Sequence, residues 1–327
     1  MRAALQRAWL RRGAAARLLW PLSLPFALLA ALRQGAYRIG LLATYRAPIP
    51  VVVVGNVVAG GAGKTPLVVA VAQHLRERGL RPGIVSRGYG RDTADCREVH
   101  AESAAADVGD EPLLVKRHTA LPVFVSRDRP EAVRALLAAH PGTQAIVSDD
   151  GLQHFALARD IEIVVFDEGG IGNGLRLPAG PLREAWPRHA DLVVCHGGPK
   201  GIEGHRMARM LADWAVRADG TQFLLNDLQG PLKAVAGIAN PEVFFRMLRE
   251  RGVPLAATQA LPDHFDFDAG IDAEGCTLLC TEKDAVKLWR THPRALAVPL
   301  LVDVEPAFWR ELDRLLDAKL SSVRSRT

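Results

Sequence analysis

The stretch VVGNVVAGGAGKTPLVVAVAQHL, residues 53–75, decides the fold of this chain. A β-branched run, typical of a strand buried on both faces in a parallel sheet, leads into a glycine-rich turn and then a segment of helical composition. The turn matches the end of the phosphate-binding pattern G-x-x-x-x-G-K-S/T, although Val58 occupies the first position. The remaining glycines still let the backbone wrap around phosphate oxygens, and the helix directs its positive end at them. We therefore expect a nucleotide site here.

The residues of this turn have separate expected roles. Lys64 is expected to hold the β- and γ-phosphates, and Thr65 to ligate Mg²⁺. Pro66 suits the first turn of the following helix, where its missing N–H costs little. The alternative is a glycine-rich turn that ends in an incidental Lys-Thr pair. The predicted nucleotide-binding residues are Val58, Ala59, Gly60, Gly61, Ala62, Gly63, Lys64 and Thr65.

Strand-like and helix-like segments alternate beyond this turn. Apolar runs recur near residues 84, 123, 146, 163 and 192, with helical segments between several of them. This alternation predicts an α/β fold with a P-loop NTPase-like, doubly wound parallel sheet. After about residue 220 the rhythm changes, so we expect two domains in the 327 residues. A phosphate-binding domain would cover 41–220 and a smaller α/β domain 221–327, with a helix at 206–218 linking them.

Charge is distributed unevenly along the chain. The first fifty residues hold eight arginines and no acidic residue, whereas the whole chain carries a net charge of only +5. A basic N-terminus on a mildly acidic body indicates one anionic surface as partner and argues against general nucleic-acid binding. The four cysteines are too sparse for a disulfide framework and indicate a reducing compartment.

The segment 1–40 combines arginines with an apolar run, Leu18–Leu32. This run is shorter than the roughly twenty residues that span a bilayer, and Pro21 and Pro25 are expected to interrupt a long helix. A cleaved signal peptide and a helix docked on the body are two alternatives. We favour an interfacial membrane anchor whose arginines meet anionic headgroups. The apolar side chains that would enter the lipid are Trp9, Leu10, Leu18, Leu19, Trp20 and Phe26.

Two adjacent acids, Asp149 and Asp150, follow the apolar run 145–147. They would lie at the end of a strand, where a phosphate-loop enzyme needs an acid to hold magnesium. Adjacent carboxylates repel each other, so they need a cation nearby. The alternative is a solvated Asp-Asp-Gly turn.

Three further motifs carry candidate residues whose roles the pattern alone leaves open. In GDEP, Asp110 and Glu111 either take part in chemistry or simply begin a helix. In DHFDF, His264 is a candidate base or the partner of a base. TEKDAVK, residues 281–287, either binds nucleotide or forms a solvated face.

Seven motifs, taken in order, resemble the tetraacyldisaccharide 4′-kinase family, the lipid A 4′-kinases of Gram-negative bacteria. They are GNVVAGGAGKTP, SRGYG, GDEP, SDDGLQH, PAGPLRE, DHFDF and TEKDAVK, and the resemblance runs from the N-terminal arm to about Asp303. It implies an enzyme that uses ATP to phosphorylate the 4′-hydroxyl of a tetraacylated glucosamine disaccharide 1-phosphate. It also implies a peripheral location at the cytoplasmic face of the bacterial inner membrane. We infer no nucleic-acid partner and no obligate protein partner.

The resemblance also implies roles for single residues. Asp110 would accept the proton of the sugar hydroxyl, with His264 as its partner. Arg183 would stabilise charge on the transferring phosphoryl group, unless it only forms a structural pair with its neighbour. Arg87 would contact substrate. The implied catalytic residues are Asp110, His264, Lys64 and Arg183; the implied Mg²⁺ set is Thr65, Asp149, Asp150 and Glu184; the cofactors are ATP and Mg²⁺.

Two other functions compete with this one. The first is a P-loop GTPase or metallochaperone ATPase. A loop that recognises guanine has the order Asn or Thr, Lys, any residue, Asp. In Thr281-Glu282-Lys283-Asp284 the lysine is third instead of second, which argues against a GTPase. The other is a non-catalytic membrane adaptor gated by nucleotide, in which the acidic residues would be structural. The nucleotide preference would distinguish the kinase from the GTPase or metallochaperone. Turnover with a lipid acceptor would distinguish it from the non-catalytic adaptor.

Overall fold

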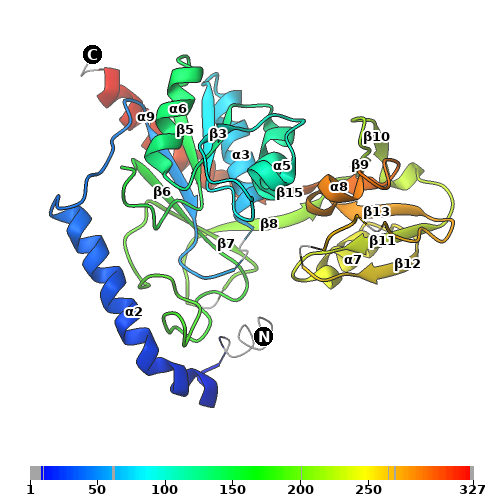
Figure 1. The fold of residues 1–327 in the computed structure, drawn as a ribbon, viewed down its shortest axis with the longest axis horizontal. Coiled ribbons are helices and arrows are strands. Elements are labelled where there is room, and N and C mark those ends of the chain that lie inside the picture. Colours follow the sequence, from blue (N-terminus) through cyan, green and yellow to red (C-terminus); the bar gives the residue numbers. More distant parts are fainter. Residues whose placement is uncertain are drawn as a thin grey trace.

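The computed structural model describes residues 9, 11–60, 63–199, 201–263, 265–268 and 270–324. Three predicted site residues, Gly61, Ala62 and His264, lie outside the described residues, as does Leu10 of the arm. Figure 1 shows two lobes joined by long strands, with a long N-terminal helix beside the larger lobe.

The first lobe is built on a nine-stranded sheet in the order β15-β8-β7-β6-β1-β5-β2-β4-β3. β1 lies in the middle, is buried along its whole length, and pairs in parallel with β5 and β6. Only the edge strands β3 and β15 pair antiparallel, so the doubly wound α/β prediction is confirmed. The strands are β1 (Val51–Gly55), β2 (Pro82–Ser86), β3 (Arg97–Glu98), β4 (Val123–Val125), β5 (Ala145–Asp149), β6 (Ile161–Phe166), β7 (Leu192–His196), β8 (His205–Leu211) and β15 (Leu300–Val304).

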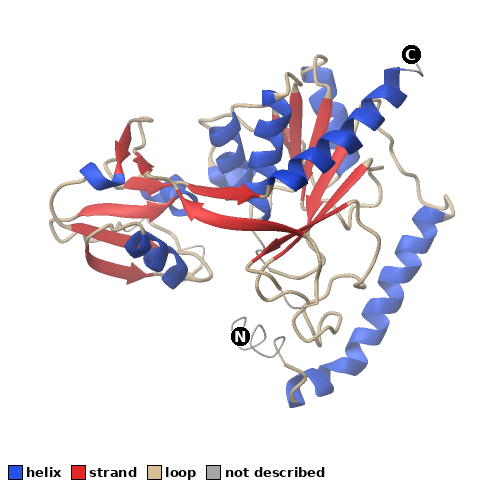
Figure 2. Cartoon of the chain, turned by 180° about the vertical axis from the view of Figure 1, so that it is seen from behind, coloured by secondary structure: helices blue, strands red, loops and turns tan. Residues whose placement is uncertain are grey.

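Helices cover both faces of this sheet (Figure 2). Apolar side chains of α3, α5 and α9 join one core cluster, and those of α6 join a second cluster on the other face. In α3 the buried residues Leu67, Val71 and Leu75 recur every four positions, the spacing that places them on one helical face. The helices are α3 (Lys64–Glu77), α4 (Ala105–Val108), α5 (Asp110–Thr119), α6 (Arg129–Ala139) and α9 (Pro306–Arg324).

The second lobe is built on a six-stranded sheet in the order β10-β9-β14-β13-β11-β12. Strands β11 to β14 pair in parallel, while β9 pairs antiparallel with β10 and β14. Its elements are β9 (Trp214–Val216), β10 (Gln222–Leu224), the 3₁₀ turn η1 (Leu225–Asp227), β11 (Leu232–Ala236), α7 (Pro241–Glu250), β12 (Leu255–Ala260), β13 (Thr277–Thr281), α8 (Glu282–Leu288) and β14 (Leu296–Val298).

Residues 206–218 form strands rather than the predicted helix. Met207, Leu211 and Ala215 are buried and lie four apart, a spacing that fits one face of a helix and equally one face of a strand. The strand forms because β7 pairs with the start of β8, from His205 to Met207, and β15 pairs with its remainder, from Met207 to Leu211. The segment does link the two lobes, since β8 belongs to the first sheet and β9 to the second.

The last part of the chain returns to the first lobe. β15 joins the nine-stranded sheet, and the α9 side chains Phe308, Leu312 and Leu316 are buried in the core that also contains α3. The six-stranded sheet takes its strands from 214–298. The predicted division into 41–220 and 221–327 therefore does not coincide with the division between the two sheets.

The apolar arm forms one continuous helix, α2 (Ala14–Arg38), with Pro21 and Pro25 inside it. The expectation that these prolines interrupt the helix is wrong, and contacts to the first lobe hold it in place. The Ser23 hydroxyl donates to the Arg176 carbonyl at 2.9 Å and accepts from the Ala179 amide at 3.1 Å. By length and composition alone α2 could cross a membrane, which is weak evidence because soluble core helices and signal sequences meet the same test.

Candidate active site

The phosphate loop needs glycine at only some of its positions. Gly60 and Gly63 have φ angles of 130° and 73°, which favour glycine. Val58 instead lies in an antiparallel bridge to Leu182, and its neighbour Ala59 donates to the Pro181 carbonyl at 2.7 Å. An extended residue tolerates a β-branched side chain, so valine fits the first position of the pattern.

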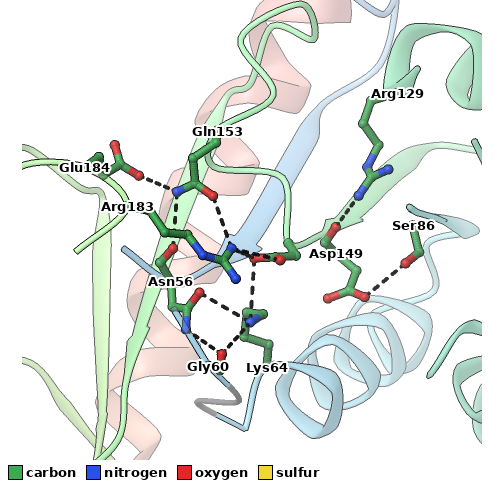
Figure 3. A network of polar contacts seen from close by, with 10 residues as sticks. Asn56, Gly60, Lys64, Ser86, Arg129, Asp149, Gln153, Arg183 and Glu184 are labelled. Atoms are coloured by element: carbon green, nitrogen blue, oxygen red, sulfur yellow. Dashed lines mark hydrogen bonds and ion pairs between the residues drawn. The ribbon is translucent and has the colours of Figure 1, made fainter. Parts of the chain in front are cut away.

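Lys64 begins α3 and connects the loop to the acidic pair (Figure 3). Its ammonium group donates to Asn56 Oδ1 at 3.3 Å and to the Gly60 carbonyl at 3.4 Å. It also forms an ion pair with Asp150 Oδ1 at 3.6 Å. The predicted lysine therefore lies at the N-terminus of a helix, where backbone N–H groups and the helix dipole favour an anion.

Asp150 lies in the left-handed region, with φ of 46°, directly after β5. Arg183 Nη1 donates to both carboxylate oxygens of Asp150 at 3.0 Å and to Gln153 Oε1 at 3.3 Å. Burial raises the pKa of Asp150, but the charges of Lys64 and Arg183 outweigh burial and leave this pKa below its ordinary value. Asp150 is therefore ionised and joins the predicted lysine and arginine.

Asp149, the last residue of β5, is buried and lacks a cation partner among the described residues. Ser86 donates to its Oδ2 at 3.1 Å, whereas its Oδ1 has no hydrogen-bond partner. Burial, aided by the charges of Glu111 and Asp150, raises the pKa of Asp149 to about 7. A buried carboxylate with one orphaned oxygen fits a divalent cation, because the cation would satisfy that oxygen and stabilise the charged form.

Glu184 lies apart from this acidic pair. Its carboxylate accepts from Gln153 Nε2 at 2.6 Å and pairs with Arg188 Nε at 3.2 Å. No group of three or more His, Cys, Asp or Glu side chains that could hold a metal occurs within the described part of the chain. Thr65, Asp149, Asp150 and Glu184 stay predicted Mg²⁺ ligands, and of these the Glu184 carboxylate already contacts Gln153 and Arg188.

Asp110 begins α5, as one of the two alternatives for GDEP requires. Gly109 before it has φ of 94°, and a Cβ there would lie 3.0 Å from the Tyr89 carbonyl, so glycine is needed for this close approach. The Asp110 carboxylate forms an ion pair across the lobes with Lys287 Nζ of α8 at 3.3 Å. Both residues line the large cleft that also contains Lys64.

A second ion pair joins the lobes near Asp110. His118 of α5 pairs with Glu282 of α8, and Glu282 also accepts from the Leu300 amide at 3.1 Å. Thr281, Glu282, Lys283 and Lys287 of TEKDAVK line the same cleft as Lys64. The TEKDAVK segment forms the N-terminal cap and first turns of α8 and faces α5 of the first lobe.

The sequence pattern assigns no role to Arg129, Asn56 and Ser86, and predicts for His154 only that it could face the cleft. Arg129 is buried and donates to the Asp149 carbonyl at 2.9 Å, and burial lowers its pKa to about 10. His154 lines the cleft, where burial and the charges of Arg129 and Arg87 lower its pKa to about 4. Asn56 and Ser86 contact Lys64 and Asp149. Asn56, Ser86 and His154 lie in three of the seven motifs named above. Arg129 lies in none of them, and the sequence shows only that it follows a short predicted strand.

Comparisons with known proteins agree on one family. The family model described as Tetraacyldisaccharide-1-P 4′-kinase matches residues 15–321. The chain is 57% identical to a tetraacyldisaccharide 4′-kinase of an Acidovorax species, covering 98% of this chain and 95% of that protein. It is 47% identical to one of Bordetella parapertussis, covering 88% of each. A crystal structure of LpxK from Aquifex aeolicus in complex with ATP is similar with a TM-score of 0.80 and 27% identity, covering 92% of this chain and 99% of that one.

Proposed function

The chain belongs to the tetraacyldisaccharide-1-P 4′-kinase family, and we propose that it transfers the γ-phosphate of ATP to the 4′-hydroxyl of a tetraacylated glucosamine disaccharide 1-phosphate. It is thus an ATP-dependent kinase of lipid A biosynthesis. One observation carries the assignment to this site: a loop lysine, a strand-end acid pair and a carboxylate on α5 all line one cleft.

The phosphate side of the reaction would use groups of the first lobe. Lys64 and the backbone N–H groups at the start of α3 bind the β- and γ-phosphates. Arg183, held 3.0 Å from Asp150, lies where a cation can stabilise charge on the transferring group. Thr65, Asp149 and Asp150 would hold Mg²⁺, which neutralises phosphate charge when bound.

The acceptor side would use Asp110. As the 4′-oxygen forms its bond to the γ-phosphorus, the bond from that phosphorus to the β-phosphate oxygen breaks and ADP leaves. The hydroxyl proton passes to the Asp110 carboxylate, which makes the sugar oxygen a better nucleophile. His264, named from the family resemblance, would orient this carboxylate.

The acceptor would be met at a membrane surface. α2 exposes several large apolar side chains along its length: Leu18, Trp20, Leu22, Leu24, Leu28, Leu29 and Leu32, with exposed fractions from 50% to 80%. Exposed leucines on a helix that also carries arginines are typical of segments that bind the interface of an anionic bilayer. At the cytoplasmic face of the inner membrane, the acyl chains of the acceptor could stay partly in lipid, which avoids about 0.8 kcal/mol per extracted methylene.

The first test is ATP-dependent phosphate transfer to tetraacyldisaccharide 1-phosphate in mixed micelles. We expect transfer by the native chain and a loss of about 10²–10⁴-fold in kcat for Asp110→Asn. Asp107→Asn is a matched control, because Asp107 lies on the preceding short helix with a half-exposed side chain. Absence of transfer by a folded native chain would overturn the function, and equal rates for both variants would move the proton acceptor elsewhere.

A further inference from the structure

Arg209 of β8 lies against the phosphate loop. β8 runs beyond the end of β7, whose last residue His196 pairs with Met207. Arg209 is therefore two residues past that end, over the carboxyl edge of the sheet. A Cβ at Gly63 would lie 3.6 Å from both Nε and Nη1 of Arg209, so the guanidinium packs against the residue that precedes α3.

This position is electrostatically unfavourable without an anion. Gly63 is the N-cap of α3, the positive end of the helix, and Lys64 follows it directly. Arg209 adds a second permanent cation at the same point. Lys64 and Arg183 have Asp150 as an ion-pair partner, whereas Arg209 forms no ion pair within the described residues.

The neighbours of Arg209 hold it without neutralising it. Its Nη2 donates to His196 Nδ1 at 3.2 Å. Burial and the charge of Arg209 lower the pKa of His196, so the ring is neutral and accepts this hydrogen bond. Burial lowers the pKa of Arg209, and the more distant charges of Asp167 and Glu168 only partly offset this decrease. His196 thus orients the guanidinium and leaves its charge available.

We propose that Arg209 binds the phosphate chain of the nucleotide held by the loop. The inference rests on the proposed use of ATP and adds a ligand that no pattern in the loop predicts. A guanidinium offers two parallel N–H donors to phosphate oxygens, a geometry that a lysine cannot reproduce. Because β8 leads on to β9 of the second lobe, this contact also ties the nucleotide to the strand that connects the lobes.

The test is calorimetric titration of the full-length protein in detergent micelles with ATP, ADP and AMP. Arg209→Ala is expected to weaken ATP and ADP binding about ten- to a hundredfold and AMP binding much less. Arg209→Lys should recover part of the loss. In steady-state kinetics the KM for ATP should rise while the KM for the lipid stays unchanged. Arg206→Ala is the control, because Arg206 is an exposed arginine of the same strand outside the cleft.

Thermal unfolding separates binding from a structural role. Without nucleotide, Arg209→Ala should unfold no earlier than the native protein, because the lost cation lies at a positive helix end; the stabilisation by ATP should shrink. Unchanged ATP affinity in Arg209→Ala would overturn this inference and leave the kinase function standing. An equal loss for AMP and ATP would also overturn it, since Arg209 would then contact the nucleoside. A native chain that neither binds ATP nor transfers phosphate would overturn the function and the inference together.

Discussion

The two halves of the site are built in different ways. The phosphate half, which we define as Lys64, Asp149, Asp150 and Arg183, lies within the first lobe, and its contacts join segments of one sheet. The acceptor half, Asp110 with Lys287, is assembled across the lobes. The fold of a single sheet therefore suffices to form the phosphate half, whereas the acceptor half depends on where the second lobe lies.

The difference extends to what each half contacts before substrate binds. Lys64 and Arg183 already share Asp150, so a nucleotide exchanges existing polar contacts for phosphate contacts. Lys287 instead forms an ion pair with Asp110, the carboxylate that we propose as the proton acceptor. Substitutions in the phosphate half and substitutions in the acceptor half should therefore change different kinetic constants.

After the loss of Asp110, the largest expected effect is the loss of the phosphate half. Lys64→Ala removes a cation that contacts Asp150, Asn56 and the Gly60 carbonyl. We expect kcat to fall about 10²–10³-fold, as when a positioned donor to a transition-state charge is removed. Lys116→Ala is the control, because the Lys116 ammonium group donates to the Leu121 carbonyl and does not line the cleft. Activity within tenfold of native would show that the phosphate half does not depend on this lysine.

The next effect concerns access of the acceptor half to lipid. Replacing Leu18, Leu22 and Leu29 with Gln removes apolar side chains that are 80%, 58% and 67% exposed. Loss of about 1 kcal/mol per partly inserted leucine should lower partitioning into anionic vesicles about a hundredfold. The KM for ATP should not change. Leu224→Gln, at 56% exposure on the second lobe, is the control; equal partitioning of both variants would contradict the membrane anchor.

A smaller effect is expected for the ion pair between Lys287 and Asp110. It tests whether Lys287 orients the Asp110 carboxylate or only joins the two lobes. Lys287→Met removes the ion pair to the carboxylate, and Glu282→Gln removes the other pair between α5 and α8. We expect Lys287→Met to lower kcat about tenfold, equivalent to 1.4 kcal/mol in the barrier, with KM for ATP unchanged. Lys287→Arg should restore most of it. If Glu282→Gln lowers kcat equally, the pair only holds the lobes together.

The same difference explains how far the sequence could predict the site. The phosphate loop lies within a few residues of its strand and helix, so local pattern and glycine chemistry suffice to place Lys64. Asp149 and Asp150 follow from the rule that parallel strands present their carboxyl ends at one edge. These parts required no knowledge of distant contacts.

Long-range pairing accounts for the parts that the sequence could not predict. The spacing of Met207 and Leu211 fits a helix as well as a strand, and pairing with β15, about ninety residues later, decides between them. The family resemblance implies Glu184 as a metal ligand, but no pattern in the sequence predicts the contacts of its carboxylate with Gln153 and Arg188. Contacts that cross between sheets, such as that of Lys287, leave no periodic signal in the chain.

The smallest effect is a pH dependence within the phosphate half. The pKa of Asp149 is raised in the folded protein, so ionisation of this carboxyl disfavours folding. Below pH 4 the group is protonated in both states and contributes nothing; its destabilisation grows as pH rises towards 7 and is constant above. The melting temperature of Asp149→Asn minus that of the native chain should therefore rise by a few degrees between pH 4 and 7. The half-exposed control Asp107→Asn should show no such rise.

Adding Mg²⁺ extends the comparison of melting temperatures between the native chain and Asp149→Asn. If Asp149 binds the cation, Mg²⁺ should raise the melting temperature of the native chain at pH 8 and leave Asp149→Asn unchanged, because the cation compensates the buried charge only where that charge exists. Equal responses of both proteins to Mg²⁺ would place the cation elsewhere. A flat difference between pH 4 and 7 would mean that Asp149 is ionised in the fold without cost, and the argument for a cation at this carboxylate would then fail.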